Sequence, residues 1–117
     1  METDAAFTGA QALAAVGNDA DLLHRIAQVF LEHQQLARVG LAAAVQSADL
    51  GRTREIAHDL KGMASTVGAR QLAERAARLE LAARAQTGAE LASELVPTLA
   101  ALDQVTDVMA ALARSAP

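Results

Sequence analysis

A histidine, a lysine and a glycine lie close together in the middle of the chain, at His58, Lys61 and Gly62. If this segment is helical, residues three and four positions apart are neighbours on the helix surface, so the lysine and the glycine flank the imidazole. Mainly apolar residues form a stripe on the opposite side of the same helix: Thr53, Ile56, Ala57, Leu60, Met63, Ala64 and Val67. This stripe would face a core, which predicts an exposed imidazole beside a cation. The cation beside the imidazole would suit an anionic group such as a phosphoryl group.

Gly62 and Lys61 are both unusual choices in this sequence. A glycine inside a helix costs about 1 kcal/mol relative to alanine, yet the chain uses alanine at 30 positions. Without a Cβ, Gly62 would leave room for a large group to reach the imidazole. Lys61 is the only lysine in the chain, and a compact ammonium on a flexible stem can follow an anion that comes and goes. His24 and His33 lack such neighbours, and we expect them at the surface or at the rim of the bundle.

The composition indicates a single domain over residues 1–117, with an aliphatic core. Cysteine, tryptophan and tyrosine are missing, and the only aromatic residues are Phe7 and Phe30. Disulfides and thiolate metal sites are therefore excluded, and the histidines do not show the spacing of a metal site. The net charge of −4 argues against a nucleic-acid surface. No apolar run approaches the ~18 residues that span a bilayer, and the acidic N-terminus does not resemble a secretory signal.

The first half of the chain predicts two helices. A short helix is expected over about residues 8–16, and its apolar side chains could either cap a bundle or supply part of a docking patch. Asn18 or Asp19 should cap a long second helix. That helix should continue to about residue 45 with a bend near residues 33–35, and Gly40 argues against one straight rod.

The second half predicts three more helices. The histidine-bearing helix should run over about 50–66 after a cap at Asp49, and Gly68 should provide the turn that ends it. The next helix is expected over about 69–86. Thr87 and Glu90 have the capping-box form for a last helix, which Pro97 should kink or split. The predicted fold class is all-α: an antiparallel up-down four-helix bundle over about 18–113 with a short N-terminal helix.

Several of these residues also occur in a known pattern. The pattern consists of His58-Asp-Leu-Lys61-Gly62, then Gly68 and Leu72, then Leu79-Glu80, preceded by Leu22-Leu23, Ile26 and Phe30. It resembles the signature of histidine phosphotransfer (HPt) domains of two-component phosphorelays, which include the phosphoryl-accepting domain of chemotaxis-type kinases. The resemblance covers roughly residues 18–113, and its elements are in register within an all-helical chain.

The resemblance implies roles for particular residues. His58 would be phosphorylated, and Lys61 would offset the charge of the phosphoryl oxygens. In the family, a glutamate or glutamine at the position of Glu80 can hydrogen-bond the other imidazole nitrogen and so fix its tautomer. The alternative for Glu80 is an ordinary exposed helix charge. Ser65 and Arg54 could touch the phosphoryl group or simply face solvent.

The resemblance also implies partners. A response-regulator receiver domain, a hybrid sensor histidine kinase or both would exchange the phosphoryl group with this chain. The receiver would supply an aspartate and bound Mg²⁺, so we expect no cofactor of the chain's own. No glycine-rich ATP-binding region is present, so no autonomous kinase activity is expected. We expect a cytoplasmic monomer without direct membrane contact, or a domain of a membrane-anchored sensor kinase.

Three functions remain open from the sequence. The chain could carry a phosphoryl group between a receiver or kinase and another receiver, or it could be the phosphoryl-accepting domain of a larger kinase. It could also be a non-catalytic bundle that binds or sequesters a regulatory partner. A dimerising kinase hairpin fits less well, because the motif of those hairpins usually continues to a proline, where this chain has Lys61-Gly62-Met63.

Overall fold

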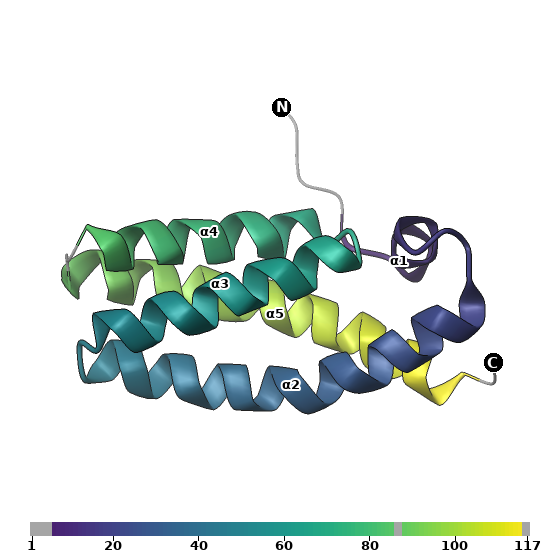
Figure 1. Cartoon of the computed structure of the whole chain (residues 1–117), viewed down its shortest axis with the longest axis horizontal. Helices are drawn as coiled ribbons and strands as arrows, with labels where there is room; N and C mark the ends of the chain where they lie inside the picture. The colour runs from purple at the N-terminus through teal and green to yellow at the C-terminus, as the bar shows by residue number, and fades with distance from the viewer. Residues whose placement is uncertain (1–5, 86–87, 116–117) are drawn as a thin grey trace.

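The structure is a computed structural model that describes residues 6–85 and 88–115. Within these residues the chain forms five α-helices and no strand (Figure 1). In chain order they are α1 (Gly9–Ala15), α2 (Ala20–Gln46), α3 (Leu50–Thr66), α4 (Arg70–Arg84) and α5 (Gly88–Arg114). The predicted all-α fold class is confirmed.

Side-chain caps begin the first three helices. Thr8 and Gln11 form a capping box at α1, with hydrogen bonds of 3.2 and 3.0 Å. The carboxylates of Asp19 and Asp49 each accept a hydrogen bond of 3.0 Å from the amide three residues later, at the starts of α2 and α3. These bonds satisfy amides that the first turn leaves free. The cap at Asp49 also fixes where α3 starts. Thr87, the predicted cap of the last helix, lies outside the described residues.

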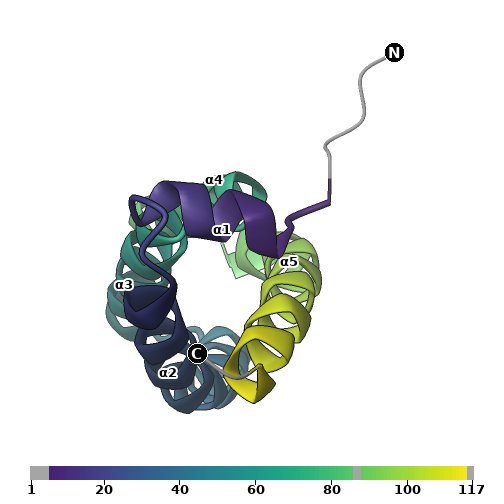
Figure 2. The same ribbon diagram turned by 90° about the vertical axis from the view of Figure 1, so that its right-hand side faces the viewer.

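The four long helices surround one core. Helix α2 contacts α3 and α5, and α4 contacts the same two helices, so the four lie in a ring when viewed along the bundle (Figure 2). Nearly all of the buried apolar side chains in the described residues are aliphatic, with Phe30 as the aromatic exception. The largest fully buried ones are Leu41, Leu60, Leu72, Leu79, Leu91, Leu102 and Met109. Their burial is the main stabilising contribution to such a fold.

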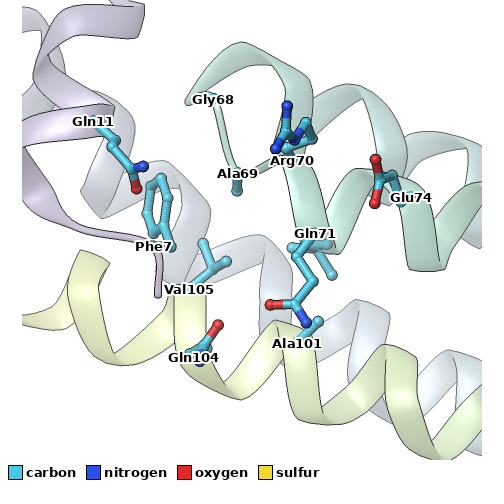
Figure 3. Close-up of a pocket in the computed structure, with 11 residues that line it drawn as sticks. Phe7, Gln11, Gly68, Ala69, Arg70, Gln71, Glu74, Ala101, Gln104 and Val105 are labelled. Atoms are coloured by element: carbon cyan, nitrogen blue, oxygen red, sulfur yellow. The ribbon is translucent and has the colours of Figure 1, made fainter. Parts of the chain in front are cut away.

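Helix α1 lies at the end of the bundle where α2 begins (Figure 1). Ala12 is fully buried, and the half-buried side chains of Phe7, Leu13 and Val16 pack against the core. Figure 3 shows Phe7 and Gln11 at a pocket of about 310 Å³ between this segment, α4 and α5. The apolar side of the leading helix is therefore packed onto the bundle, which favours the capping interpretation over a free docking patch.

Two glycines permit close contacts between elements. Gly68 ends α3 with a φ of +71°, and a Cβ built on it would lie 3.1 Å from the Cβ of Ala15. The turn therefore requires glycine both for its left-handed backbone and for the approach of α1. A Cβ on Gly40 would lie 2.8 Å from Cδ1 of Ile56. Gly40 thus lets α2 approach α3, and α2 continues through this position as one helix.

Helix α5 was expected to be kinked or split at Pro97. It continues through Pro97 as one helix, so the split does not occur. Residues Ala89–Arg114 are also long and apolar enough, by length and composition alone, to cross a membrane. Charged residues interrupt this helix, so the expectation that no uninterrupted apolar run approaches ~18 residues holds. The criterion is weak, because the core helix of a soluble protein also meets it, and Leu91, Leu102 and Met109 of α5 are fully buried in the bundle.

Ala48 provides a first test of the fold. It follows the C-cap of α2 with a φ of 57°, a left-handed conformation that strains any residue with a Cβ. We expect Ala48→Gly to raise the free energy of unfolding by about 1 kcal/mol, measured by urea denaturation. Ala42→Gly, at an exposed position inside the same helix, should lower it by about 1 kcal/mol. Equal destabilisation by both variants would contradict the turn described here.

Candidate functional site

His58 projects from the side of α3 that faces solvent. Its helix buries Ile56, Ala57, Leu60 and Ala64 against the core, and at 3.6 residues per turn this leaves the imidazole on the other side. The His58 side chain is 65% exposed. The predicted placement of an exposed histidine on a helix therefore agrees with the structure.

Glu80 reaches His58 from the neighbouring helix α4. Its side chain is only 9% exposed, and Oε2 lies 3.1 Å from Nδ1 of His58. Its other oxygen, Oε1, lies 3.0 Å from Nζ of Lys61. One buried carboxylate thus binds both the histidine and the lysine, although the two residues come from α3. Glu80 is not the exposed helix charge that was its alternative interpretation.

The hydrogen bond to Glu80 assigns the tautomer of His58. An ionised carboxylate only accepts hydrogen bonds, so Nδ1 carries the proton and donates it to Oε2. In the neutral ring the lone pair then resides on Nε2. The arrangement combines a nucleophilic nitrogen on an exposed ring with a fixed proton on the other nitrogen.

Glu80 is ionised at neutral pH. The hydrogen bond from Lys61 holds the pKa of Glu80 below its usual value of 4.5, and His58 contributes in the same direction. Burial alone would raise this pKa, but the two basic neighbours outweigh it. A buried carboxylate that stays charged in this way accepts charge-assisted hydrogen bonds from both partners.

This lowered pKa predicts how stability depends on pH. Because the pKa is lower in the folded chain, ionised Glu80 stabilises the fold fully above about pH 4.5, and the contribution is lost as the pH falls through the folded pKa. The difference in unfolding free energy between wild type and Glu80→Gln should therefore be largest at neutral pH and shrink in acid. Denaturation at several pH values measures it, with Glu74→Gln, at an exposed position of α4, as control. A difference that grows in acid would contradict this assignment.

Charged side chains of both signs surround the histidine. An open hollow of about 650 Å³ is lined by His58, Glu80, Arg52, Arg54, Glu55, Asp59 and Arg84. Nη2 of Arg84 lies 4.0 Å from Oε2 of Glu80, one helical turn away on α4. The sequence analysis named Arg54 but not Arg84. The i, i+4 spacing of Glu80 and Arg84 was the signal that could have found it.

Ser65 and Gly62 were also predicted as site residues, and neither lines the hollow. Ser65 is exposed on α3. Gly62 is also exposed, and a Cβ built on it would have nothing within 4 Å. Packing within the described residues therefore gives no reason for a glycine at this position.

The remaining histidines lie elsewhere. His24 is half-buried, and its Nδ1 lies 3.2 Å from the carbonyl oxygen of Leu112 in α5, so it joins the two terminal helices of the bundle. His33 is exposed at the groove between α2 and α3. In residues 6–85 and 88–115 no group of three or more histidine, cysteine, aspartate or glutamate residues is placed to hold a metal ion.

Comparison with known families identifies the chain. The family model described as "Hpt domain" matches residues 25–115, which include the whole of α3 and α4. The chain belongs to the Hpt domain family. Hpt domains are helical bundles with a role in histidine phosphotransfer, and they interact with receiver domains or kinases of phosphorelays. No match was found among curated proteins or among solved structures.

Proposed function

We propose that this Hpt domain is a phosphorelay intermediate that carries a phosphoryl group on Nε2 of His58. One observation carries the proposal: an exposed imidazole whose Nδ1 is held by the buried carboxylate of Glu80. A non-catalytic module that sequesters a partner would not need a histidine with a fixed tautomer. The family membership supports the same choice.

The transfer step follows from this tautomer. The Nε2 lone pair attacks the phosphorus of an acyl phosphate on a receiver aspartate, the N–P bond forms, and the P–O bond to the aspartate breaks. The electron pair of that bond leaves with the aspartate as a carboxylate. The proton of His58 stays on Nδ1, where Glu80 stabilises the positive charge that develops on the ring. Onward transfer to another receiver is the reverse of this step.

Neighbouring residues would assist without forming bonds to phosphorus. Lys61, one turn from His58, would offset the charge of the phosphoryl oxygens, and Arg54 lines the same hollow. The open space at Gly62 would let a partner approach the ring. Ser65 is the weaker candidate, since it lies seven residues beyond His58, about two helical turns away on α3.

The partner would be a response-regulator receiver domain, a sensor histidine kinase or both. We place the Mg²⁺ of the reaction in the receiver, as the family resemblance implies. The platform we envisage is an antiparallel up-down arrangement of α2–α5, which the short turns between consecutive helices favour. We retain the expectations of a cytoplasmic monomer and of no autonomous kinase activity. The phosphoryl-accepting domain of a larger kinase would use the same site.

An exposed apolar residue near the His58 hollow supports a protein partner. Leu36 on α2 is 74% exposed and borders a groove that Arg52 and Asp59 also line. Both of these residues line the His58 hollow as well, so the groove and the hollow are adjacent. We place the receiver across this combined surface.

A charge at Leu36 tests this docking surface. We expect Leu36→Glu to lower the rate of transfer from a receiver about 10-fold without affecting stability, because an apolar contact would be replaced by a desolvated charge. Val96→Glu is the matched control, since Val96 is an equally exposed apolar residue on α5. Equal rates for Leu36→Glu and wild type, measured below saturation, would exclude this orientation of the partner.

Phosphoryl transfer tests the proposed function itself. Phosphorylated receiver domains from the same organism should label the wild-type chain, and the label should be acid-labile and base-stable, as a phosphoramidate is. If no receiver or kinase labels the folded chain, the non-catalytic binding module becomes the better account.

A further inference from the structure

The buried carboxylate of Glu80 has three basic neighbours, and only two of them are within hydrogen-bond distance. Lys61 occupies Oε1 at 3.0 Å and His58 occupies Oε2 at 3.1 Å. Arg84 stands 4.0 Å from Oε2, beyond hydrogen-bond distance, with a side chain that is 62% exposed. Its guanidinium is therefore close to Glu80 but free to move nearer.

A phosphoryl group on His58 would change what Lys61 binds; this step rests on the proposed function. Lys61 is one turn from His58 on the same face of α3, and its side chain is 38% exposed, so it has freedom to turn outward. The phosphoryl group would bring close to two negative charges to the ring. Those charges would attract the ammonium away from Oε1. A buried carboxylate that loses its cation is strongly destabilised.

We propose that Arg84 is the exchange counter-ion of the site: it closes onto Glu80 when Lys61 turns to the phosphoryl group. The two residues are at i and i+4 on α4, with the glutamate nearer the N-terminus, which is the favourable order for such a pair. A guanidinium can approach a carboxylate with two parallel hydrogen bonds. Glu80 would remain ionised and would keep its hold on Nδ1 in both states. Arg84 is thus a positioning residue that acts through Glu80.

The exchange has a specific signature in the equilibrium between this chain and a receiver. The quantity measured is the equilibrium ratio of phosphorylated chain to phosphorylated receiver. Arg84→Gln should lower this ratio about 5- to 10-fold, because only the phosphorylated state needs Arg84. Arg84→Lys should retain most of the wild-type value, since it keeps the cation. Arg78→Gln, at an exposed position of α4 outside the hollow, is the control and should match wild type.

A second variant separates the exchange from direct contact with the phosphoryl group. In a Lys61→Gln background, Arg84 is the cation that pairs with Glu80 whether or not His58 is phosphorylated. Arg84→Gln should then no longer shift the phosphoryl-transfer equilibrium with the receiver. The experiment mixes each variant with one phosphorylated receiver domain, lets the reaction reach equilibrium and measures the label on both proteins. Thermal unfolding of the unphosphorylated variants checks that the folds are equivalent.

Each outcome decides the proposal. A phosphorylated fraction of Arg84→Gln equal to that of Arg78→Gln would overturn it, while labelled wild type would leave the proposed function standing. An Arg84→Gln effect that persists undiminished without Lys61 would also overturn it, since Arg84 would then act on the phosphoryl group directly. A wild-type chain that accepts no label would overturn the proposed function together with the exchange.

Discussion

Replacing His58 with glutamine is expected to remove all acid-labile, base-stable phosphate from the chain. Glutamine is of similar length and can still donate a hydrogen bond to Glu80, but its amide nitrogen has no lone pair available for attack on phosphorus. Because His58 is 65% exposed, the substitution should leave the core intact. The measurement is the amount of label transferred from a phosphorylated receiver, with unfolding midpoints recorded in parallel.

His24→Gln is the matched control for this prediction. His24 is also a histidine on a helix, but its Nδ1 contacts the carbonyl oxygen of Leu112, and it lines neither the His58 hollow nor the groove beside Leu36. His24→Gln should accept label as wild type does. Label on His58→Gln, or loss of label from both variants, would contradict the assignment of His58.

Substitution of Gly62 should separate stability from function. A Cβ at this position meets nothing within 4 Å, so Gly62→Ala should raise the free energy of unfolding by about 1 kcal/mol through helix propensity alone. Gly62→Gln should also be more stable than wild type, yet it should lower the transfer rate about 100-fold, because a side chain would displace the partner from the imidazole. Denaturation and transfer kinetics on the same preparations measure both effects.

Gly51→Ala is the control for a glycine in the same helix. Gly51 is exposed in the first turn of α3, where a Cβ would make only ordinary contact with Asp49. Gly51→Ala should have a higher free energy of unfolding than wild type and the same phosphoryl-transfer rate. If Gly62→Gln transfers as fast as Gly51→Ala, steric clearance is not the reason for Gly62.

The position of His58 could be predicted from local information. The apolar stripe from Ile56 to Ala64 and the cap at Asp49 are properties of one helix, and they determine which side faces solvent. Gly68 was likewise predicted as a turn, from the rule that helices end in a left-handed residue. Its contact with α1 was not predicted, since that contact joins segments far apart in the sequence.

Other features could not be predicted from the sequence, because they depend on how the helices pack against one another. Composition and periodicity alone do not place Glu80 against His58, and that expectation came from the family resemblance. The burial of Glu80 and the close approach of Ile56 to Gly40 both depend on how neighbouring helices pair. Charged residues interrupt each apolar run of α5, so the sequence shows no spanning run, although the helix as a whole meets the criterion of length and composition.

The most direct test of the account is to identify the nitrogen that carries the phosphoryl group. The chain, labelled with ¹⁵N at histidine, would be phosphorylated by a receiver and studied by phosphorus and nitrogen NMR. We predict one phosphohistidine, at His58, with phosphorus bonded to Nε2 and the proton retained on Nδ1 beside Glu80. Phosphorus on Nδ1 or on another histidine would contradict the account, as would a wild-type chain that stays unlabelled with receivers that phosphorylate other Hpt domains.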